Sequence, residues 1–280
     1  MSGVIDYLIN PFWPEAIKKN YLEGGEGERL ASVGRVPKAY EPDEFIAQMD
    51  KDGLQHVLIA SIFTWNYIDQ HAHVHTTWEE VAAYTDRYPE RMSGLYGVNP
   101  FRGMRGVREF ETAVKEHGFR GIHIHPHGFG LRPDDAFYFP FYAKALELGV
   151  PVVISMGHTL DFMPQENARP ILLDRIAIYF PDLKLVCAHT GWPWVEEAIA
   201  IASKHPNVYL GTSAYAPKYW KPEMVQFLNS RRGNEKTMFG TDWPLFNHSE
   251  ALAQLEDLGL KPENKQKLLH DNAARVFGLD

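Results

Sequence analysis

PVVIS at residues 151–155 and KLVCA at residues 184–188 are the stretches that decide the fold. Each is a short, nearly continuous apolar run, which is typical of a strand covered on both faces of a parallel sheet. A segment with helical periodicity separates them, and parallel neighbours need a crossover connection of this kind. The pattern therefore predicts a parallel sheet whose strands alternate with helices.

Eight such runs recur along the chain, and each is predicted to be a strand. They are Val4–Ile9, His56–Ile62, Met92–Val98, Gly121–His125, Val152–Met156, Leu183–Ala188, Val208–Gly211 and Thr237–Gly240. Helical periodicity is found at Pro42–Lys51, Trp78–Tyr88, Gly106–His117, Phe139–Leu148, Ala168–Tyr179, Val195–His205, Lys221–Arg231, Ser249–Leu258 and Pro262–Phe277. Eight strand–helix units in 280 residues predict an α/β fold, a (β/α)8 TIM-type barrel that forms a single domain over residues 1–280.

Residues 11–40 separate the first predicted strand from the first predicted helix, and residues 24–40 show no clear element. Active sites of such barrels lie at the C-terminal ends of the strands. Long connections at that end are either surface excursions or functional lids. The sequence leaves both interpretations open for residues 11–40.

Composition and charge exclude several classes of function. The 28 basic and 36 acidic residues give a formal charge of -8 without a basic stripe, so we expect no nucleic acid partner. We expect no membrane-spanning helix, because no run approaches 18 consecutive apolar residues. We expect no signal peptide, because MSGVIDYLINPF at residues 1–12 lacks a basic region followed by a long apolar run. Cys187 is the single cysteine, so no internal disulfide can form and nothing requires an oxidising compartment. The sequence predicts a cytoplasmic protein with a small-molecule substrate.

Histidines and one aspartate lie at the C-terminal ends of the predicted strands, where the active site of such a barrel is found. His123 and His125 end the fourth strand, His158 follows the fifth, His189 follows the sixth and Asp242 follows the eighth. Imidazole titrates near neutral pH, and a carboxylate can orient it or act as a base. We therefore predict a catalytic site at these strand ends.

Four motifs then carry a family resemblance: CAHTGW at 187–192, GTDWP at 240–244, GIHIHP at 121–126 and DNAARVFGL at 271–279. Together they resemble the amidohydrolase-related family, and most of all the branch of aminocarboxymuconate-semialdehyde decarboxylase and the dihydroxybenzoate-type decarboxylases. The resemblance extends over nearly the whole chain. It implies non-redox cleavage of a small carboxylated unsaturated or aromatic compound, by decarboxylation or hydrolysis.

The resemblance also implies a metal site that this sequence does not complete. The family takes a His-x-His pair from strand one, a His from strand five and an Asp from strand eight, and it uses a separate strand-six His in catalysis. Asp242 and His189 match the last two positions. The other three fall on Leu8, Asn10 and Ser155, which are not zinc ligands of the usual kind. We expect no metal at the family site and no other cofactor.

Three interpretations remain open. In the first, a metal-free enzyme uses His189 as the general acid and Asp242 as the base or orienting group. In the second, a divalent metal such as zinc has a relocated site made of His123, His125, His158 and Asp242, because residues two apart on a strand share a face. In the third, the chain is a catalytically degenerate subunit that binds a ligand or a partner. Redox chemistry on a transition metal is a further alternative.

Further residues are predicted around the site. The expected substrate-binding residues are His125, His158, Trp192, Tyr215 and Trp243, because aromatic walls suit planar substrates. Arg132 and Arg169 follow strands four and five and are candidates to clamp a carboxylate. His71, His73 and His75 form a second cluster, in which His71 and His75 would share a face if the segment were helical. By analogy with other barrels, we also expect a homodimer.

Overall fold

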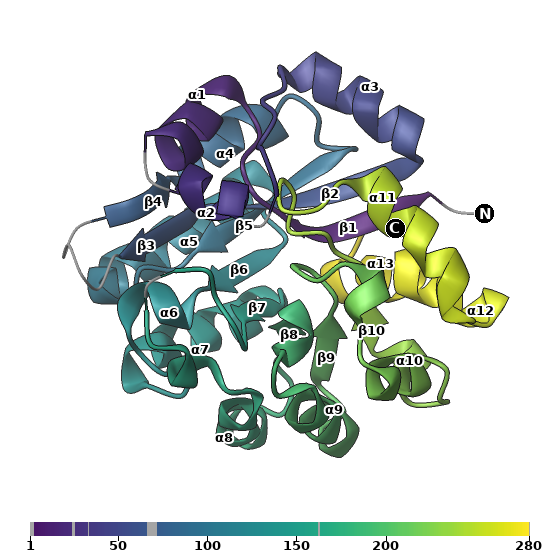
Figure 1. Ribbon diagram of the computed structural model, residues 1–280. Helices are drawn as coiled ribbons and strands as arrows, with labels where there is room; N and C mark the ends of the chain where they lie inside the picture. The colour runs from purple at the N-terminus through teal and green to yellow at the C-terminus, as the bar shows by residue number, and fades with distance from the viewer. Residues whose placement is uncertain (1–2, 24–25, 33, 66–71, 162, 280) are drawn as a thin grey trace.

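The protein is a closed parallel barrel surrounded by helices (Figure 1). The structure is a computed structural model that describes residues 3–23, 26–32, 34–65, 72–161 and 163–279. Eight parallel strands follow the order β1-β2-β5-β6-β7-β8-β9-β10. They are β1 (Val4–Ile9), β2 (Leu54–Ala60), β5 (Met92–Gly97), β6 (Gly121–Ile124), β7 (Val152–Ser155), β8 (Leu185–Ala188), β9 (Val208–Gly211) and β10 (Thr237–Met238). The predicted TIM-barrel fold is confirmed.

The barrel closes between β1 and the segment that follows β10. The backbone N–H of Asp242 donates to the carbonyl of Leu8 at 3.0 Å, and that of Asn10 donates to the carbonyl of Trp243 at 2.8 Å. Beneath them, the fully buried Asp6 carboxylate accepts the backbone N–H and the hydroxyl of Thr241. These bonds fix the position of Asp242 relative to the first strand.

The surrounding helices form where the sequence places amphipathic segments and caps. They are α1 (Pro14–Ile17), α2 (Glu26–Ser32), α3 (Pro42–Asp52), α4 (Trp78–Thr85), α5 (Gly103–His117), α6 (Pro126–Phe129), α7 (Phe139–Leu148), α8 (Leu173–Tyr179), α9 (Val195–Lys204), α10 (Pro222–Leu228), α11 (His248–Leu255), α12 (Pro262–Gln266) and α13 (Asn272–Phe277). Thr77 and Glu80 form a capping box at the start of α4, which satisfies two backbone N–H groups that would otherwise lack partners. Gly53 ends α3 in the left-handed conformation.

A hairpin that the sequence analysis did not predict follows β2. It pairs β3 (Ile62–Trp65) with β4 (Ala72–Thr76) in antiparallel register, outside the barrel sheet. His75 lies on β4 opposite Phe63, so the helical arrangement considered for the second histidine cluster is wrong. His71 and the side chain of His73 lie outside the described part of the structure.

Residues 11–40 contain more helix than the sequence predicted. Helix α1 is followed by a π-helical turn (Lys18–Leu22) and then by α2, which falls within the stretch that showed no clear element. The buried Asn20 donates to the Thr76 hydroxyl at 2.8 Å and accepts the backbone N–H of His75 at 3.1 Å. These bonds join the excursion to the hairpin.

The core consists of an inner and an outer layer. Inside the barrel, side chains such as Leu8, Leu58, Leu95 and Val186 form an apolar cluster, and the outer layer lies between the strands and the helices. Cys187 is fully buried in that outer layer, and burial raises the pKa of its thiol to about 12. In the described ranges, no helix has the length and apolar character needed to cross a bilayer.

Candidate active site

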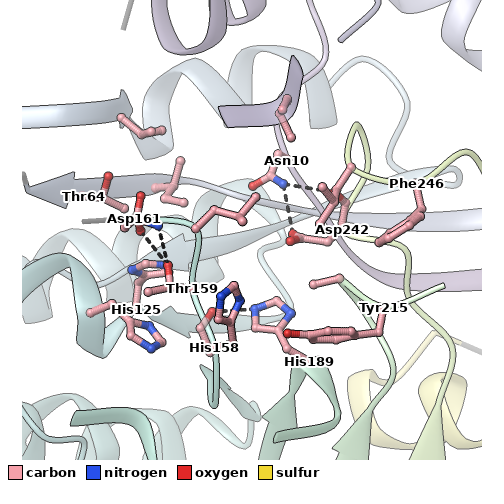
Figure 2. Close-up of a pocket in the computed structure, with 18 of the residues that line it drawn as sticks. Asn10, Thr64, His125, His158, Thr159, Asp161, His189, Tyr215, Asp242 and Phe246 are labelled. Carbon is pink, nitrogen blue, oxygen red and sulfur yellow. Dashed lines mark hydrogen bonds and ion pairs between the residues drawn. The ribbon is translucent and has the colours of Figure 1, made fainter. Parts of the chain in front are cut away.

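A cavity of about 390 Å³ lies at the carboxyl ends of the strands (Figure 2). Of the residues that the sequence predicted for the site, those that line it are His123, His125, His158, His189, Trp192, Tyr215 and Asp242. The excursion contributes Tyr21 and Leu30, and the hairpin contributes Ile62 and Val74. The strand ends thus supply the polar part of the wall, and the two added segments supply much of the apolar part.

Trp243 does not line this cavity, although the sequence analysis expected it to bind substrate. Its ring is buried at 4% exposure and packs against Phe12, Tyr40 and Phe45. The backbone of Asp242 is left-handed, with φ of 59°. This turn ends the regular alternation of the strand, so Trp243 points into the outer core while Pro244, Leu245 and Phe246 reach the cavity.

The carboxyl group of Asp242 has a neighbour from the first strand. Asn10 Nδ2 donates to Asp242 Oδ1 at 3.0 Å (Figure 2). Burial raises the pKa of Asp242 to about 7, since desolvation disfavours the charged form, and nearby Asp6 acts in the same direction while the Asn10 hydrogen bond opposes it. Asp242 can therefore exchange a proton near neutral pH.

His189 lies in the turn after β8, where two serines hold its side chain. Its backbone φ is 60°, a conformation that costs free energy for a residue with a side chain and recurs at functional sites. Nε2 lies 3.0 Å from Ser155 Oγ, and Nδ1 lies 3.0 Å from Ser213 Oγ. Burial lowers the pKa of His189 to about 4, so the imidazole is neutral at pH 7.

A buried hydrogen-bonded chain holds both ring nitrogens of His189. The fully buried Tyr7 hydroxyl is hydrogen-bonded to Ser213 Oγ, which is in turn bonded to His189 Nδ1. On the other side, Ser155 Oγ joins His189 Nε2 to His123 Nε2, which lies 2.9 Å from that oxygen. The neutral imidazole of His189 is thereby held in one orientation at the cavity wall.

The end of the cavity beside β6 is also polar. His125 Nδ1 accepts the backbone N–H of Gly128 at 3.0 Å, so its Nε2 carries a hydrogen, and that atom lies 3.6 Å from Asp161 Oδ2. Thr159 donates its hydroxyl to the same carboxylate oxygen at 3.1 Å. His127 is buried in α6, and its Nε2 lies 2.9 Å from the carbonyl oxygen of Gly157.

Aromatic rings form one side of the opening. Trp192 contacts His158 edge-on, with ring centroids 5.3 Å apart, and it contacts Tyr215 at 5.5 Å. Trp192 is 36% exposed, whereas Tyr215 and His158 are partly buried. This arrangement can hold a planar ligand.

The residues at the family's metal positions do not fit a metal. Leu8 is buried in the apolar cluster inside the barrel, Asn10 turns its amide N–H toward Asp242, and Ser155 is bonded to two imidazoles. The relocated set of His123, His125, His158 and Asp242 does line one cavity. Nevertheless, no three His, Cys, Asp or Glu side chains within the described residues converge as metal ligands do.

No lysine or arginine lines the cavity among the residues that the structure describes. Arg132 pairs with Asp134, and Arg169 pairs with Glu197, both outside it. The clamp role considered for these two arginines is therefore wrong. A carboxylate in the cavity meets neutral hydrogen-bond donors rather than a described cation.

The model of the family described as amidohydrolase matches residues 54–279. The chain belongs to the amidohydrolase family. This confirms the resemblance of the four motifs and the expectation of an amidohydrolase-type enzyme. The match includes the segments that contribute His189 and Asp242.

Known relatives resemble this amidohydrolase over most of its length. The chain is 24% identical over 239 residues to a 2-keto-4-carboxy-3-hexenedioate hydratase of Sphingobium sp. strain SYK-6, with 70% of this chain and 69% of the relative covered. It is 24% identical over 243 residues to a gamma-resorcylate decarboxylase of Polaromonas sp. strain JS666, with 69% and 72% covered. A solved 5-carboxyvanillate decarboxylase from Novosphingobium aromaticivorans, which has bound manganese, shares the fold with a TM-score of 0.72 and 17% identity over 98% of this chain and 97% of that chain.

Several cavity residues escaped the sequence analysis. Asn10 was considered only as a poor metal ligand, and its proximity to Asp242 depends on barrel closure. Thr64 comes from the unpredicted hairpin, and Asp161 comes from the loop after β7. One signal in the sequence could have identified Asn10. It occupies the position of the second His in the family's His-x-His pair, and a residue at that position is expected to face the active site.

Proposed function

We propose that this amidohydrolase acts without a metal and cleaves a small carboxylated unsaturated or aromatic compound, by decarboxylation. Its relatives support the substrate class, since one is named for decarboxylation of gamma-resorcylate and the other for hydration of a carboxylated, unsaturated keto acid. Both kinds of reaction place a proton on an unsaturated carbon. The active site must therefore contain a proton donor.

The observation that carries the proposal is the placement of Asp242 and His189 on one cavity, with Asn10 bonded to the carboxyl group. Asp242, with its pKa raised to about 7, is protonated in a large share of molecules at neutral pH. His189, with its pKa lowered to about 4, is a poor acid there. The roles are thus the reverse of those expected from sequence: Asp242 donates the proton and His189 polarises a substrate oxygen.

The reaction then balances in two steps. Asp242 transfers its proton to the carbon that bears the carboxylate, while His189 shares a ring N–H with a substrate oxygen. The bond to the carboxylate breaks, its electron pair returns to the unsaturated system, and carbon dioxide leaves. Against an apolar wall with no described cation, a carboxylate is destabilised relative to neutral carbon dioxide, which favours this step. Water reprotonates Asp242.

The decisive experiment compares the wild-type protein with Asp242→Asn on a panel of benzoates, muconates and lactones. An amide cannot deliver the proton, so we expect turnover to fall by about a hundredfold or more. Asp50→Asn, the same change at an exposed site on α3, is the control and should keep the wild-type rate. Release of carbon dioxide identifies decarboxylation, whereas opening of a lactone would assign hydrolysis instead.

Metal dependence is tested on the same material. Dialysis against a chelator should leave wild-type turnover unchanged, because the donor set at the family positions does not fit a metal. Loss of activity that returns with zinc or manganese would contradict the metal-free proposal. Stabilisation by a panel compound without turnover would favour the degenerate, ligand-binding interpretation.

The excursion of residues 11–40 is also proposed to act as a lid. Tyr21 and Leu30 line the cavity, so the segment covers bound substrate as long as it stays against the hairpin. The Asn20 bonds to β4 maintain that contact. Closure would exclude water from the carboxylate.

A further inference from the structure

The proposed reaction gives no role to His123, although its ring lines the same cavity as His189 and Asp242. His123 lies on β6 and is 4% exposed. Its Nε2 lies 2.9 Å from Ser155 Oγ, and its Nδ1 has no hydrogen-bond partner among the described residues. One ring nitrogen of His123 is thus left to interact with a ligand in the cavity.

Ser155 connects His123 to His189. Its Oγ lies 2.9 Å from His123 Nε2 and 3.0 Å from His189 Nε2, and these contacts are the described hydrogen bonds of the serine side chain. Burial lowers the pKa of both imidazoles, so each ring is neutral at pH 7 and carries one hydrogen. A hydroxyl has a single hydrogen and cannot donate to both rings. In a fully bonded bridge, Ser155 therefore donates to one ring and accepts the N–H of the other.

This bridge couples the tautomers of the two rings. When His189 carries its hydrogen on Nε2, Ser155 donates to His123 Nε2, so the hydrogen of His123 is on Nδ1. When His123 carries its hydrogen on Nε2, Ser155 donates to His189 Nε2, so the hydrogen of His189 is on Nδ1. Ser213 Oγ, 3.0 Å from His189 Nδ1, can donate or accept, and it permits both states.

The two states present different chemistry to the cavity. In the first state, His123 offers an Nδ1–H donor, and the N–H of His189 lies beside Ser155, which lines the cavity. In the second state, His123 Nδ1 is an acceptor, and the N–H of His189 faces Ser213, which is not among the described lining residues. A carbonyl or carboxylate oxygen carries no hydrogen, so it can bond to His123 Nδ1 only in the first state.

We propose that His123 binds an acceptor oxygen of the substrate and, through Ser155, selects the tautomer of His189. The oxygen accepts the Nδ1–H of His123, and the bridge then keeps the hydrogen of His189 on Nε2, on the side of the ring that lies beside the cavity-lining serine. Substrate binding thereby shifts the population toward one of two states that the free protein can adopt. This inference deepens the proposed function and rests on it for the identity of the cavity as the active site.

The test observes the tautomers directly, so it does not depend on turnover. Long-range proton–nitrogen NMR correlation spectra of the isotope-labelled full chain distinguish Nδ1–H from Nε2–H imidazoles. The signals are assigned by their loss in His123→Gln and His189→Gln. Acetophenone is the probe, because it is unreactive and has one carbonyl acceptor. We expect the complex to show His123 with its hydrogen on Nδ1 and His189 with its hydrogen on Nε2.

Isopropenylbenzene is the matched probe, since a methylene group replaces the carbonyl oxygen of acetophenone at nearly the same shape. It should bind wild-type protein about threefold or more weakly, as the loss of one hydrogen bond implies, and it should leave the tautomers of the free protein unchanged. His123→Phe keeps a ring but has no N–H. In this variant the two probes should bind equally.

Ser155→Ala gives a readout that a merely structural role would not produce. It removes the bridge, so acetophenone should still fix the hydrogen of His123 on Nδ1 while the tautomer of His189 no longer follows. Ser155→Thr keeps the hydroxyl and should keep the coupling. Ser93→Ala is the matched control, because it removes a buried serine from the ring of His56 outside the cavity, and it should leave the coupling unchanged.

An acetophenone complex in which both rings carry hydrogen on Nε2 would overturn the coupling, because Ser155 would then accept from both. A His189 tautomer that still follows the probe in folded Ser155→Ala, verified by its thermal unfolding curve, would overturn it as well. Equal affinity of the two probes for the wild-type protein would overturn the role of His123 in binding.

These results are separate from the Asp242→Asn experiment, because neither probe is turned over. Coupled tautomers in a protein that shows no turnover would contradict only the proposed reaction. Turnover with uncoupled tautomers would contradict only the role of His123.

Discussion

At the scale of single residues, left-handed backbone conformations position the two proposed catalytic side chains. His189 and Asp242 have φ values of 60° and 59°, and Thr190 and Ala214 are also positive. Each lies where a strand ends, at or beside the cavity. Such conformations persist only where the surrounding structure holds them, as the serines do for His189 and the barrel closure does for Asp242.

The pH dependence follows from Asp242. If its protonated form is the donor, kcat/KM is highest below pH 7 and falls as the pH rises through about 7, where the raised pKa removes the proton. The Asn10 N–H stabilises the carboxylate and so lowers this pKa. In Asn10→Ala the falling limb should therefore move to higher pH, by about one unit, which is the usual spread of pKa values in folded proteins. Rate measurements between pH 5 and 10 on both proteins check this, and a limb that stays in place would exclude Asp242 as the titrating donor.

At the scale of elements, the added hairpin and the excursion support each other. The hairpin of β3 and β4 lies outside the barrel sheet, and residues 11–40 pack on it through Asn20. Both segments contribute cavity wall. Their mutual contact therefore links the stability of this region to the shape of the site.

Asn20→Ala should destabilise the protein by about 1–3 kcal/mol, because it removes the Asn20 partner of the buried Thr76 hydroxyl and of the part-buried His75 N–H. Lys19→Ala is the neighbouring control. The described partner of Lys19 is Glu80, in an exposed ion pair, so its loss should change stability by less than about 0.5 kcal/mol. Urea unfolding measures both, and equal midpoints for the two variants would contradict the role of Asn20.

Sequence patterns predicted the strands better than the segments between them. PVVIS and KLVCA are buried on both faces, so their apolar runs mark β7 and β8 directly. The hairpin was missed because IFTW continues the apolar run of β2 and gives no separate signal. The histidines of β4 suggested a cluster rather than a strand, since their spacing alone does not distinguish the two.

For the site, the sequence predicted which strand ends contribute residues to the cavity. It did not predict for every residue whether the side chain points into the cavity. His189 and Asp242 follow strands whose register fixes their location. Trp243 was wrongly predicted as a wall residue, because the turn at Asp242 abolishes the period of two. Asp161 and Thr64 come from loops and the hairpin, whose paths depend on tertiary packing.

At the scale of the whole molecule, the barrel is acidic overall, and its described cavity wall has no cation. The proposed carboxylated substrate therefore meets hydrogen-bonding and apolar groups on the described part of this wall. Homodimer formation and a cytoplasmic location stay predictions. The fold is common to the family, so the residues of the cavity, and not the fold, determine which substrate is bound.

The single thiol, Cys187, reports on the packing of helices against the barrel. Because it is fully buried in the outer layer, a maleimide reaches the sulfur only when the helices move away from β8 or the chain unfolds. We expect mass spectrometry to find almost no adduct on the native chain over hours and one adduct per chain within minutes in strong denaturant. Rapid alkylation of the native protein would mean that the helical layer opens over β8 in the folded state. Alkylation of this one cysteine thus measures how often that layer separates from the strands, without any engineered label.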